Sequence, residues 1–181
     1  MTKRAFSLIE ILILLAIIAI LTTLAIPTIR GALASAQRSQ LLSNSKQVYA
    51  TLIRAEGEGE NLWPSTNSFN DWASKLTPRI STNDAKSIFG GAGITVSTWP
   101  PDKASLLVYQ VSSFSDEDYI LVSSHNWDAS APAALEANAA PFGESGFIYV
   151  TKGGRGGIGY QKDATNAING QPAPLVGNPS P

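Results

Sequence analysis

The feature that most constrains this chain is one carboxylate at the start of a long apolar stretch. Residues 11–21 carry no polar side chain, and the stretch continues to Ile26. Counted from Phe6, it reaches the ~20 residues that a helix needs to cross a bilayer. Glu10 lies near its amino-terminal end, where a charge at bilayer depth is costly enough to indicate a functional site. The sequence therefore predicts a membrane-spanning helix whose glutamate needs a cationic partner.

The basic residues beside this stretch predict its orientation. Lys3 and Arg4 precede it, and an excess of basic residues on one side of a span keeps that end in the cytoplasm. The rest of the chain then faces outward.

Residues 3–10, KRAFSLIE, followed by aliphatic residues and then Pro27, resemble the class III signal of type IV pilins and type II secretion pseudopilins. The resemblance implies that a prepilin peptidase cuts between Ala5 and Phe6 and methylates the new amino terminus. Glu10 then becomes the fifth residue of the mature chain. Ala5 departs from the family pattern, which usually has glycine before the cut, so we expect slower processing.

The resemblance also implies a function, a location and partners. The chain is expected to be a structural filament subunit and not an enzyme. It would lie in the bacterial inner membrane as a single-pass protein with a cytoplasmic amino terminus, and after assembly in a periplasmic or cell-surface filament. The implied partners are further copies in a helical filament, the prepilin peptidase, an inner-membrane assembly platform, and minor pilins or pseudopilins. The absence of cysteine slightly favours the pseudopilins, since many type IVa pilins carry a carboxy-terminal disulfide.

The new amino terminus at Phe6 is the expected cationic partner of Glu10. Cleavage before Phe6 exposes a cationic amine, and methylation to a secondary amine keeps the charge. Pairing this amine with Glu10 of a neighbouring subunit offsets the cost of burying both ions. The pair also sets the axial register between subunits, as one buried polar residue does in a coiled coil.

Three other interpretations of the amino-terminal region stay open. Glu10 is also compatible with an ordinary anchor whose glutamate reaches the lipid headgroups. A secretory signal peptide would use residues 34–36 as its cleavage site, but the apolar stretch ends about ten residues before that site. The third is an uncleaved anchor that tethers an extracytoplasmic binding or enzymatic domain.

Beyond Pro27 the sequence keeps a helical pattern. Residues 41, 45, 48 and 52 recur at the spacing of one helix face, while Arg38, Lys46 and Arg54 fall elsewhere. The acidic, glycine-rich segment 56–61 then ends the helix and serves as a linker. The predicted parts are a leader at 1–5, a long helix at 6–56 that spans the membrane roughly over 6–29, a globular head at 57–167 and a flexible tail at 168–181.

Pro27 and Gly31 are expected to break the long helix. Proline removes an intrahelical hydrogen bond and clashes with the preceding turn, and glycine loosens the backbone further. The alternatives are a plain kink where the helix leaves the membrane and local melting during assembly.

The predicted head is α+β. Ser68 is the expected cap of a short helix over 69–76. Four segments rich in β-branched or aromatic residues are predicted strands, namely 94–98, 106–111, 119–123 and 147–151. A fifth strand, 158–161, is expected to pair with 147–151. The fold class is thus a long amino-terminal helix, transmembrane in its first half, packed against a small antiparallel sheet.

The net charge of the chain and the position of its acidic residues limit the ligands that it is expected to bind. Removing Lys3 and Arg4 from the 13 basic side chains leaves 11 against 14 acidic ones, and no basic stripe is interleaved with aromatic residues, so nucleic acid is not a predicted partner. Asp116, Glu117 and Asp118 offer hard oxygen ligands, and calcium in this loop is an alternative to a solvated turn. No other cofactor is predicted.

Two apparent catalytic motifs are interpreted as structural. Residues 154–159 satisfy G-x-G-x-x-G, but no helical pattern follows them, so a turn is expected. Ser123, Ser124, His125 and Asp128 have the residue types of a triad, yet neighbours on one short segment do not converge. The four tryptophans are expected mainly in the core.

Overall fold

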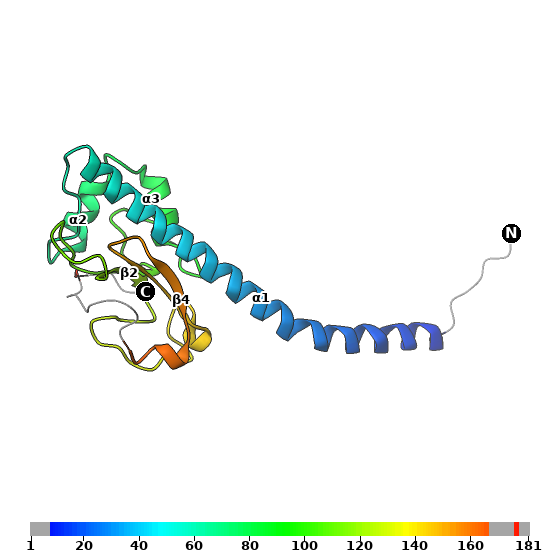
Figure 1. The fold of residues 1–181 in the computed structure, drawn as a ribbon. Helices are drawn as coiled ribbons and strands as arrows, with labels where there is room; N and C mark the ends of the chain where they lie inside the picture. Colours follow the sequence, from blue (N-terminus) through cyan, green and yellow to red (C-terminus); the bar gives the residue numbers. More distant parts are fainter. Residues whose placement is uncertain (1–7, 167–175, 178–181) are drawn as a thin grey trace. The chain divides into compact units, whose positions relative to one another are not determined.

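The structure, a computed structural model, describes residues 8–166 and 176–177. It divides into two compact units, Met1–Ala36 and Gln37–Pro181. The elements, in chain order, are α1 (Leu8–Gly57), α2 (Phe69–Leu76), α3 (Thr82–Phe89), β1 (Leu106–Val108), β2 (Ile120–Ser124), the 3₁₀ helix η1 (Gly143–Ser145), β3 (Phe147–Thr151), β4 (Gly156–Gly159) and the 3₁₀ helix η2 (Gln161–Asp163) (Figure 1). The α+β class, with a long apolar helix and a small antiparallel sheet, is confirmed.

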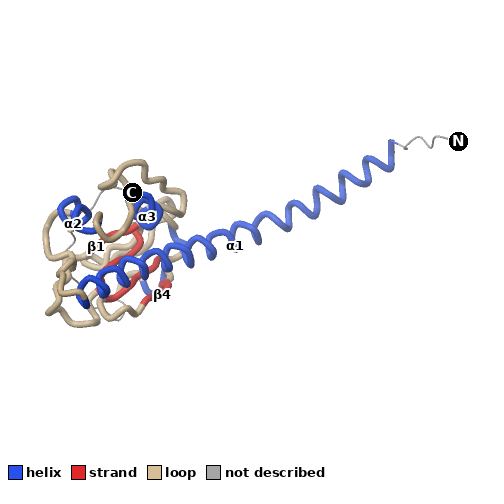
Figure 2. The backbone as a smooth tube through the Cα atoms, turned by 90° about the horizontal axis from the view of Figure 1, so that it is seen from above, coloured by secondary structure: helices blue, strands red, loops and turns tan. Residues whose placement is uncertain are grey.

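The last part of α1, from Gln37 onward, belongs to the second unit and packs on its sheet (Figure 2). The predicted helix face is buried, because Leu41, Ser45, Val48 and Leu52 are each 1% exposed or less. Ser45 satisfies its hydroxyl by donating to the carbonyl oxygen of Leu41 at 2.9 Å. An apolar stripe with the helical period is what such packing requires.

The sheet is an antiparallel meander in the order β1-β2-β3-β4. β3 has its predicted bounds, and it pairs with β4 as expected, with Phe147 opposite Gly159 and Val150 opposite Gly156. β4 itself lies two residues earlier than the predicted strand 158–161, because Gly156 and Gly157 take part in the pairing. β1 is shorter than predicted and β2 begins one residue later.

The predicted strand 94–98 is wrong. Ile94 uses its backbone groups in a local turn, because the Gly91 amide donates to the Ile94 carbonyl oxygen at 2.8 Å and the reverse bond measures 3.0 Å. Gly91 and Gly93 have φ values of 102° and 92°, which favour glycine. Val96 packs into the core from an irregular segment instead.

α2 begins and ends where predicted, and its Ser68 hydroxyl accepts from the Asp71 amide at 3.3 Å. α3 was not predicted. Its cap has the same chemistry, since the Ser81 hydroxyl accepts from the Asp84 amide at 3.1 Å. The Ser-x-x-Asp spacing was a usable signal for this second helix start.

Each face of the sheet has its own apolar cluster. On the α1 face, Phe69, Trp72 and Phe89 from α2 and α3 meet edge to face, with ring centroids 5.4 to 6.0 Å apart. On the other face, Trp127 stacks on Phe147 with centroids 4.2 Å apart. The prediction that the tryptophans lie mainly in the core is confirmed, since Trp63, Trp72 and Trp127 are buried.

The predicted flexible tail lies largely outside the described residues. Two of its residues are described, and they pack on the head. Val176 is fully buried, and its amide donates to the Val108 carbonyl oxygen at 3.0 Å. The Gly177 amide donates to the Asn67 carbonyl oxygen at 2.9 Å. The expectation that the tail has little to bury is wrong at Val176, because the edge beside β1 offers it a partner.

Candidate assembly surface

Residues 8–29 of α1 present an apolar helix surface on all sides, interrupted by Glu10 and three threonines. Every residue from 8 to 33 is exposed in the isolated chain, and large side chains such as Leu8 and Leu24 are 82% and 68% exposed. α1 is long and apolar enough to cross a membrane. A helix that is apolar all round needs lipid or other protein around it.

The few hydroxyls in this apolar part bond to their own helix. Thr22 Oγ1 donates to the Ile18 carbonyl oxygen at 2.7 Å, and Thr23 Oγ1 donates to that of Ile20 at 2.8 Å. Such internal bonds satisfy polar groups where water is absent. The threonines are therefore compatible with an apolar environment.

Glu10 is the acidic residue in the first turn of α1. It is exposed, and the ion pairs found among the described residues do not involve it. Ala5 and Phe6, the predicted processing and pairing residues, lie outside the described residues. The predicted amine–glutamate pair therefore stays a prediction.

Pro27 and Gly31 do not interrupt the helix of the isolated chain, since α1 is continuous through both. Local melting at this point is thus absent in this state, and a kink stays a prediction. Melting of this stretch during assembly stays a prediction.

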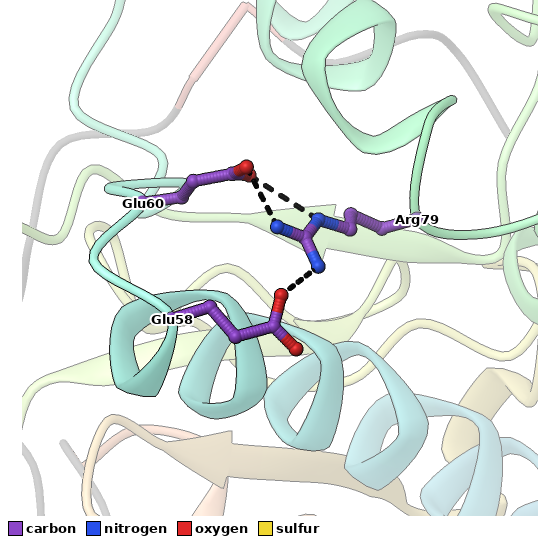
Figure 3. Close-up of polar contacts among 3 residues, drawn as sticks. All are labelled: Glu58, Glu60 and Arg79. Carbon is purple, nitrogen blue, oxygen red and sulfur yellow. Dashed lines mark hydrogen bonds and ion pairs between the residues drawn. The ribbon is translucent and has the colours of Figure 1, made fainter.

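The acidic linker is more ordered than the sequence indicated (Figure 3). Arg79 forms ion pairs with both Glu58 and Glu60, and its Nη2 lies 2.7 Å from Glu60 Oε1. The hydrogen bonds to Glu60 and Glu58 raise the pKa of Arg79 above its ordinary value. The segment after α1 is therefore tied to the loop that follows α2.

The side chains of the acidic loop do not converge in the structure. Among the described residues, no three His, Cys, Asp or Glu side chains come together as a group able to hold a metal ion. Asp118 pairs with Arg155, and the Glu117 carbonyl oxygen accepts from the Gly153 amide at 2.8 Å. The side chains of Asp116, Glu117 and Asp118 are thus not gathered around one point, and calcium in this loop stays a prediction.

The two serines of the apparent triad are buried and stabilise the core. Ser123 Oγ lies 2.9 Å from the Tyr109 hydroxyl and donates to the Trp127 carbonyl oxygen at 2.7 Å. The Tyr109 hydroxyl also accepts from the Ala129 amide at 2.7 Å. Burial raises the pKa of Tyr109 well above its ordinary value. Ser124 Oγ accepts from the Ile148 amide at 3.0 Å.

The glycine-rich segment forms a turn and a strand, as its lack of a following helix indicated. Gly154 has φ of 78° in the turn before β4. At Gly159, an added Cβ would lie 2.3 Å from the Phe147 ring, so this glycine leaves room for packing in the core.

Arg38, in the second unit, lies on the buried face of α1 and not off it. Arg38 was expected off the buried helix face, yet it is only 9% exposed. Its Nη1 donates to the Ser145 carbonyl oxygen, and its Cζ lies 5.8 Å from the centroid of the Tyr160 ring. Position 38 precedes Leu41 by three residues and so shares its face.

Comparison with known proteins adds no relative: no family model, no curated protein and no solved structure matches this chain. What this chain does is therefore inferred from its own residues, above all from the exposed apolar part of α1 and its glutamate.

Proposed function

We propose that this chain is a structural subunit of a type IV pilus-like filament or type II secretion pseudopilus. One observation carries the proposal, which is that residues 8–29 form an apolar helix with no buried face in the isolated chain and with Glu10 in its first turn. Before assembly, lipid covers this apolar surface. In a filament, neighbouring copies of the same helix cover it.

Glu10 favours a filament over a simple anchor. A carboxylate at bilayer depth costs roughly 2.5 to 3.5 kcal/mol at the helix centre and less near the end of the span, where Glu10 lies, and a simple anchor gains nothing from it. In a filament, the amine of Phe6 in one copy neutralises Glu10 of another. Removing one partner of a buried pair typically costs about 3 to 5 kcal/mol, so the pair selects one axial register.

The proposal includes the maturation and location of the chain. Prepilin peptidase cuts between Ala5 and Phe6 and methylates Phe6. The precursor lies in the inner membrane with its amino terminus in the cytoplasm. An assembly platform and minor pilins or pseudopilins then help to build a periplasmic or cell-surface filament, and the small α+β head is the pilin-like domain displayed on it.

Mass spectrometry of the mature amino terminus tests the maturation step. We expect a chain that begins with methylated Phe6. A chain that begins at Gln37 would indicate a secretory signal peptide, and an intact Met1 would indicate an uncleaved anchor. Either result would contradict the proposal.

Substitution of Glu10 tests the assembly step. We expect Glu10→Ala and Glu10→Lys to prevent filament formation while the protein stays in the membrane. Glu56→Ala is the matched control, since Glu56 is an exposed acid of the same helix and lies outside the apolar part. Filaments as abundant with Glu10→Ala as with the natural residue would refute the assembly mechanism.

A further inference from the structure

The first unit carries two charged side chains of opposite sign. Glu10 and Arg30 are the charged residues of the described segment 8–36, and both are exposed in the isolated chain. The ion pairs of the described residues do not use either of them. In the proposed function, the amine of Phe6 is the partner of Glu10. Arg30 therefore needs a partner of its own where assembly removes water from this part of the helix.

The spacing of the two charges along the helix matches the thickness of a bilayer. α1 is continuous between Glu10 and Arg30, and twenty residues at 1.5 Å each separate their Cα atoms by about 30 Å along the axis. The hydrocarbon core of a bilayer is also about 30 Å thick. When Glu10 lies near one interface, Arg30 lies near the opposite headgroups, where a long basic side chain reaches water.

The two side chains also leave the helix in nearly opposite directions. At 3.6 residues per turn, a spacing of twenty residues places them about 160° apart around the axis. Two parallel copies can therefore stand side by side with Arg30 of one copy directed at its neighbour and Glu10 of the neighbour directed back. Charges on a single face would not meet in this way unless one copy made half a turn about its axis.

We propose that Arg30 of one copy of the chain pairs with Glu10 of a second, parallel copy displaced along the filament by about 30 Å. The second copy is then raised by about one thickness of the hydrocarbon core, so its Glu10 meets a cation as it leaves the membrane. The planar guanidinium matches the two oxygens of a carboxylate. The pair joins different patches of one subunit, and such a heterologous contact, when repeated without closing, builds an open helical array.

The proposal rests on the proposed filament function and adds a second contact to it. Pairing of the Phe6 amine with Glu10 displaces two copies by four residues, which is only about 6 Å. The pair with Arg30 displaces them by about 30 Å, so the two contacts involve different neighbours. A carboxylate accepts on both of its oxygens, and one Glu10 therefore serves the amine of one copy and the guanidinium of another.

Engineered cysteines test the displacement, because the chain contains no cysteine. Leu14 lies one turn beyond Glu10, and Ala34 lies one turn beyond Arg30. Within one copy these two positions are about 30 Å apart, so a short bifunctional maleimide links only different copies. Leu14→Cys combined with Ala34→Cys should give a ladder of multimers in filaments. The matched control combines Leu14→Cys with Ala32→Cys, which lies within one turn of Ala34 but points away from the face of Arg30, and should give at least tenfold less.

Substitution of Arg30 tests the charge. Arg30→Gln should lower the filament yield at least tenfold, measured as processed subunit in the sheared, sedimented fraction, and Arg30→Lys should retain most of the yield. Processing at Phe6 should not change, which excludes loss of the subunit from the membrane as the cause. Arg54→Gln is the matched control, since Arg54 is an exposed arginine of the same helix outside the first unit, and it should assemble as the parent does.

A double substitution identifies the partner of Arg30. In the Glu10→Gln chain Arg30 has no partner, so the further change Arg30→Gln removes an unpaired charge and should raise the filament yield. The same change lowers the yield of the natural chain. An Arg30 that served lipid phosphates, or an acid other than Glu10, would lower the yield in both chains. A yield no higher than that of Glu10→Gln alone would contradict the pair.

The contact and the filament function can fail separately. Filaments that form normally without the cross-link between positions 14 and 34 would overturn the contact and leave the proposed function intact. An unchanged yield with Arg30→Gln would do the same. A chain that is not processed at Phe6 and forms no filaments would contradict the proposed function, and the contact with it.

Discussion

Gly159 provides the sharpest test of the packing in the head. An added Cβ would lie 2.3 Å from Cζ of Phe147 and 2.6 and 2.8 Å from two further ring atoms. The ring is fully buried and stacks on Trp127 at 4.2 Å between centroids, so it has no free space to move into. Overpacking of this kind costs about 1 to 3 kcal/mol. At roughly 2 to 4 °C per kcal/mol for a chain of this size, Gly159→Ala should lower the melting temperature by about 2 to 12 °C.

Tryptophan fluorescence of the full-length protein in detergent measures this effect. All four tryptophans belong to the second unit, so the signal reports the unfolding of the head. Phe147→Leu should recover part of the loss in the Gly159→Ala chain, because it removes the opposing ring atoms. A double-mutant cycle then gives the coupling between the two positions.

Gly31→Ala is the matched control, because the same methyl group meets no atom within 4 Å there. Alanine is favoured over glycine in a helix interior by roughly 0.5 to 1 kcal/mol, and Gly31 lies in the first unit, so the melting temperature of the head should not fall. An unchanged or higher melting temperature for Gly159→Ala, or an equal loss for Gly31→Ala, would refute the steric argument.

Three further predictions concern the head. Trp72 Nε1 donates to the Leu62 carbonyl oxygen at 2.8 Å in the core, so Trp72→Phe should leave that oxygen unpaired and cost about 1 to 3 kcal/mol in urea unfolding; no loss would contradict this. The raised pKa of Tyr109 means that the unfolded chain loses this proton first, so stability should fall above about pH 10, by up to roughly 1.4 kcal/mol per pH unit. Tyr109→Phe should show a smaller pH slope between pH 9 and 11, and an equal slope would exclude Tyr109 as the cause. Because the side chains of residues 116–118 do not converge, a chelator should leave the melting temperature unchanged, and a clear decrease would support the calcium hypothesis.

Where a helix or strand depends mainly on neighbouring residues, its position could be predicted from the sequence. α2 follows from Ser68 and its cap, and its bounds were predicted correctly. β3 and β4 are joined by a glycine turn, so their pairing was readable from neighbouring residues. The apolar part of α1 and its glutamate are also local features, and they carry the proposed assembly site.

Residues 94–98 show where this reasoning fails. Their β-branched composition favours a strand, but two glycines close a turn at Gly91 and Ile94. The irregular backbone that follows this turn then places the Val96 side chain in the core without a strand partner. Strand propensity describes a fit to a half-buried surface, and the rest of the fold decides whether that surface exists.

The sequence by itself determined the long apolar helix, the position of Glu10 within it and the α+β class, because helix period, hydropathy and turn residues act over a few neighbours. Only the tertiary structure decided that Arg38 is buried, that Val176 pairs with Val108 and that Arg79 holds Glu58 and Glu60. It also decided that Lys152 donates to the carbonyl oxygens of Ser113 and Ser115. Each of these contacts joins residues far apart in the chain, and their free energy depends on the distance and burial that folding creates.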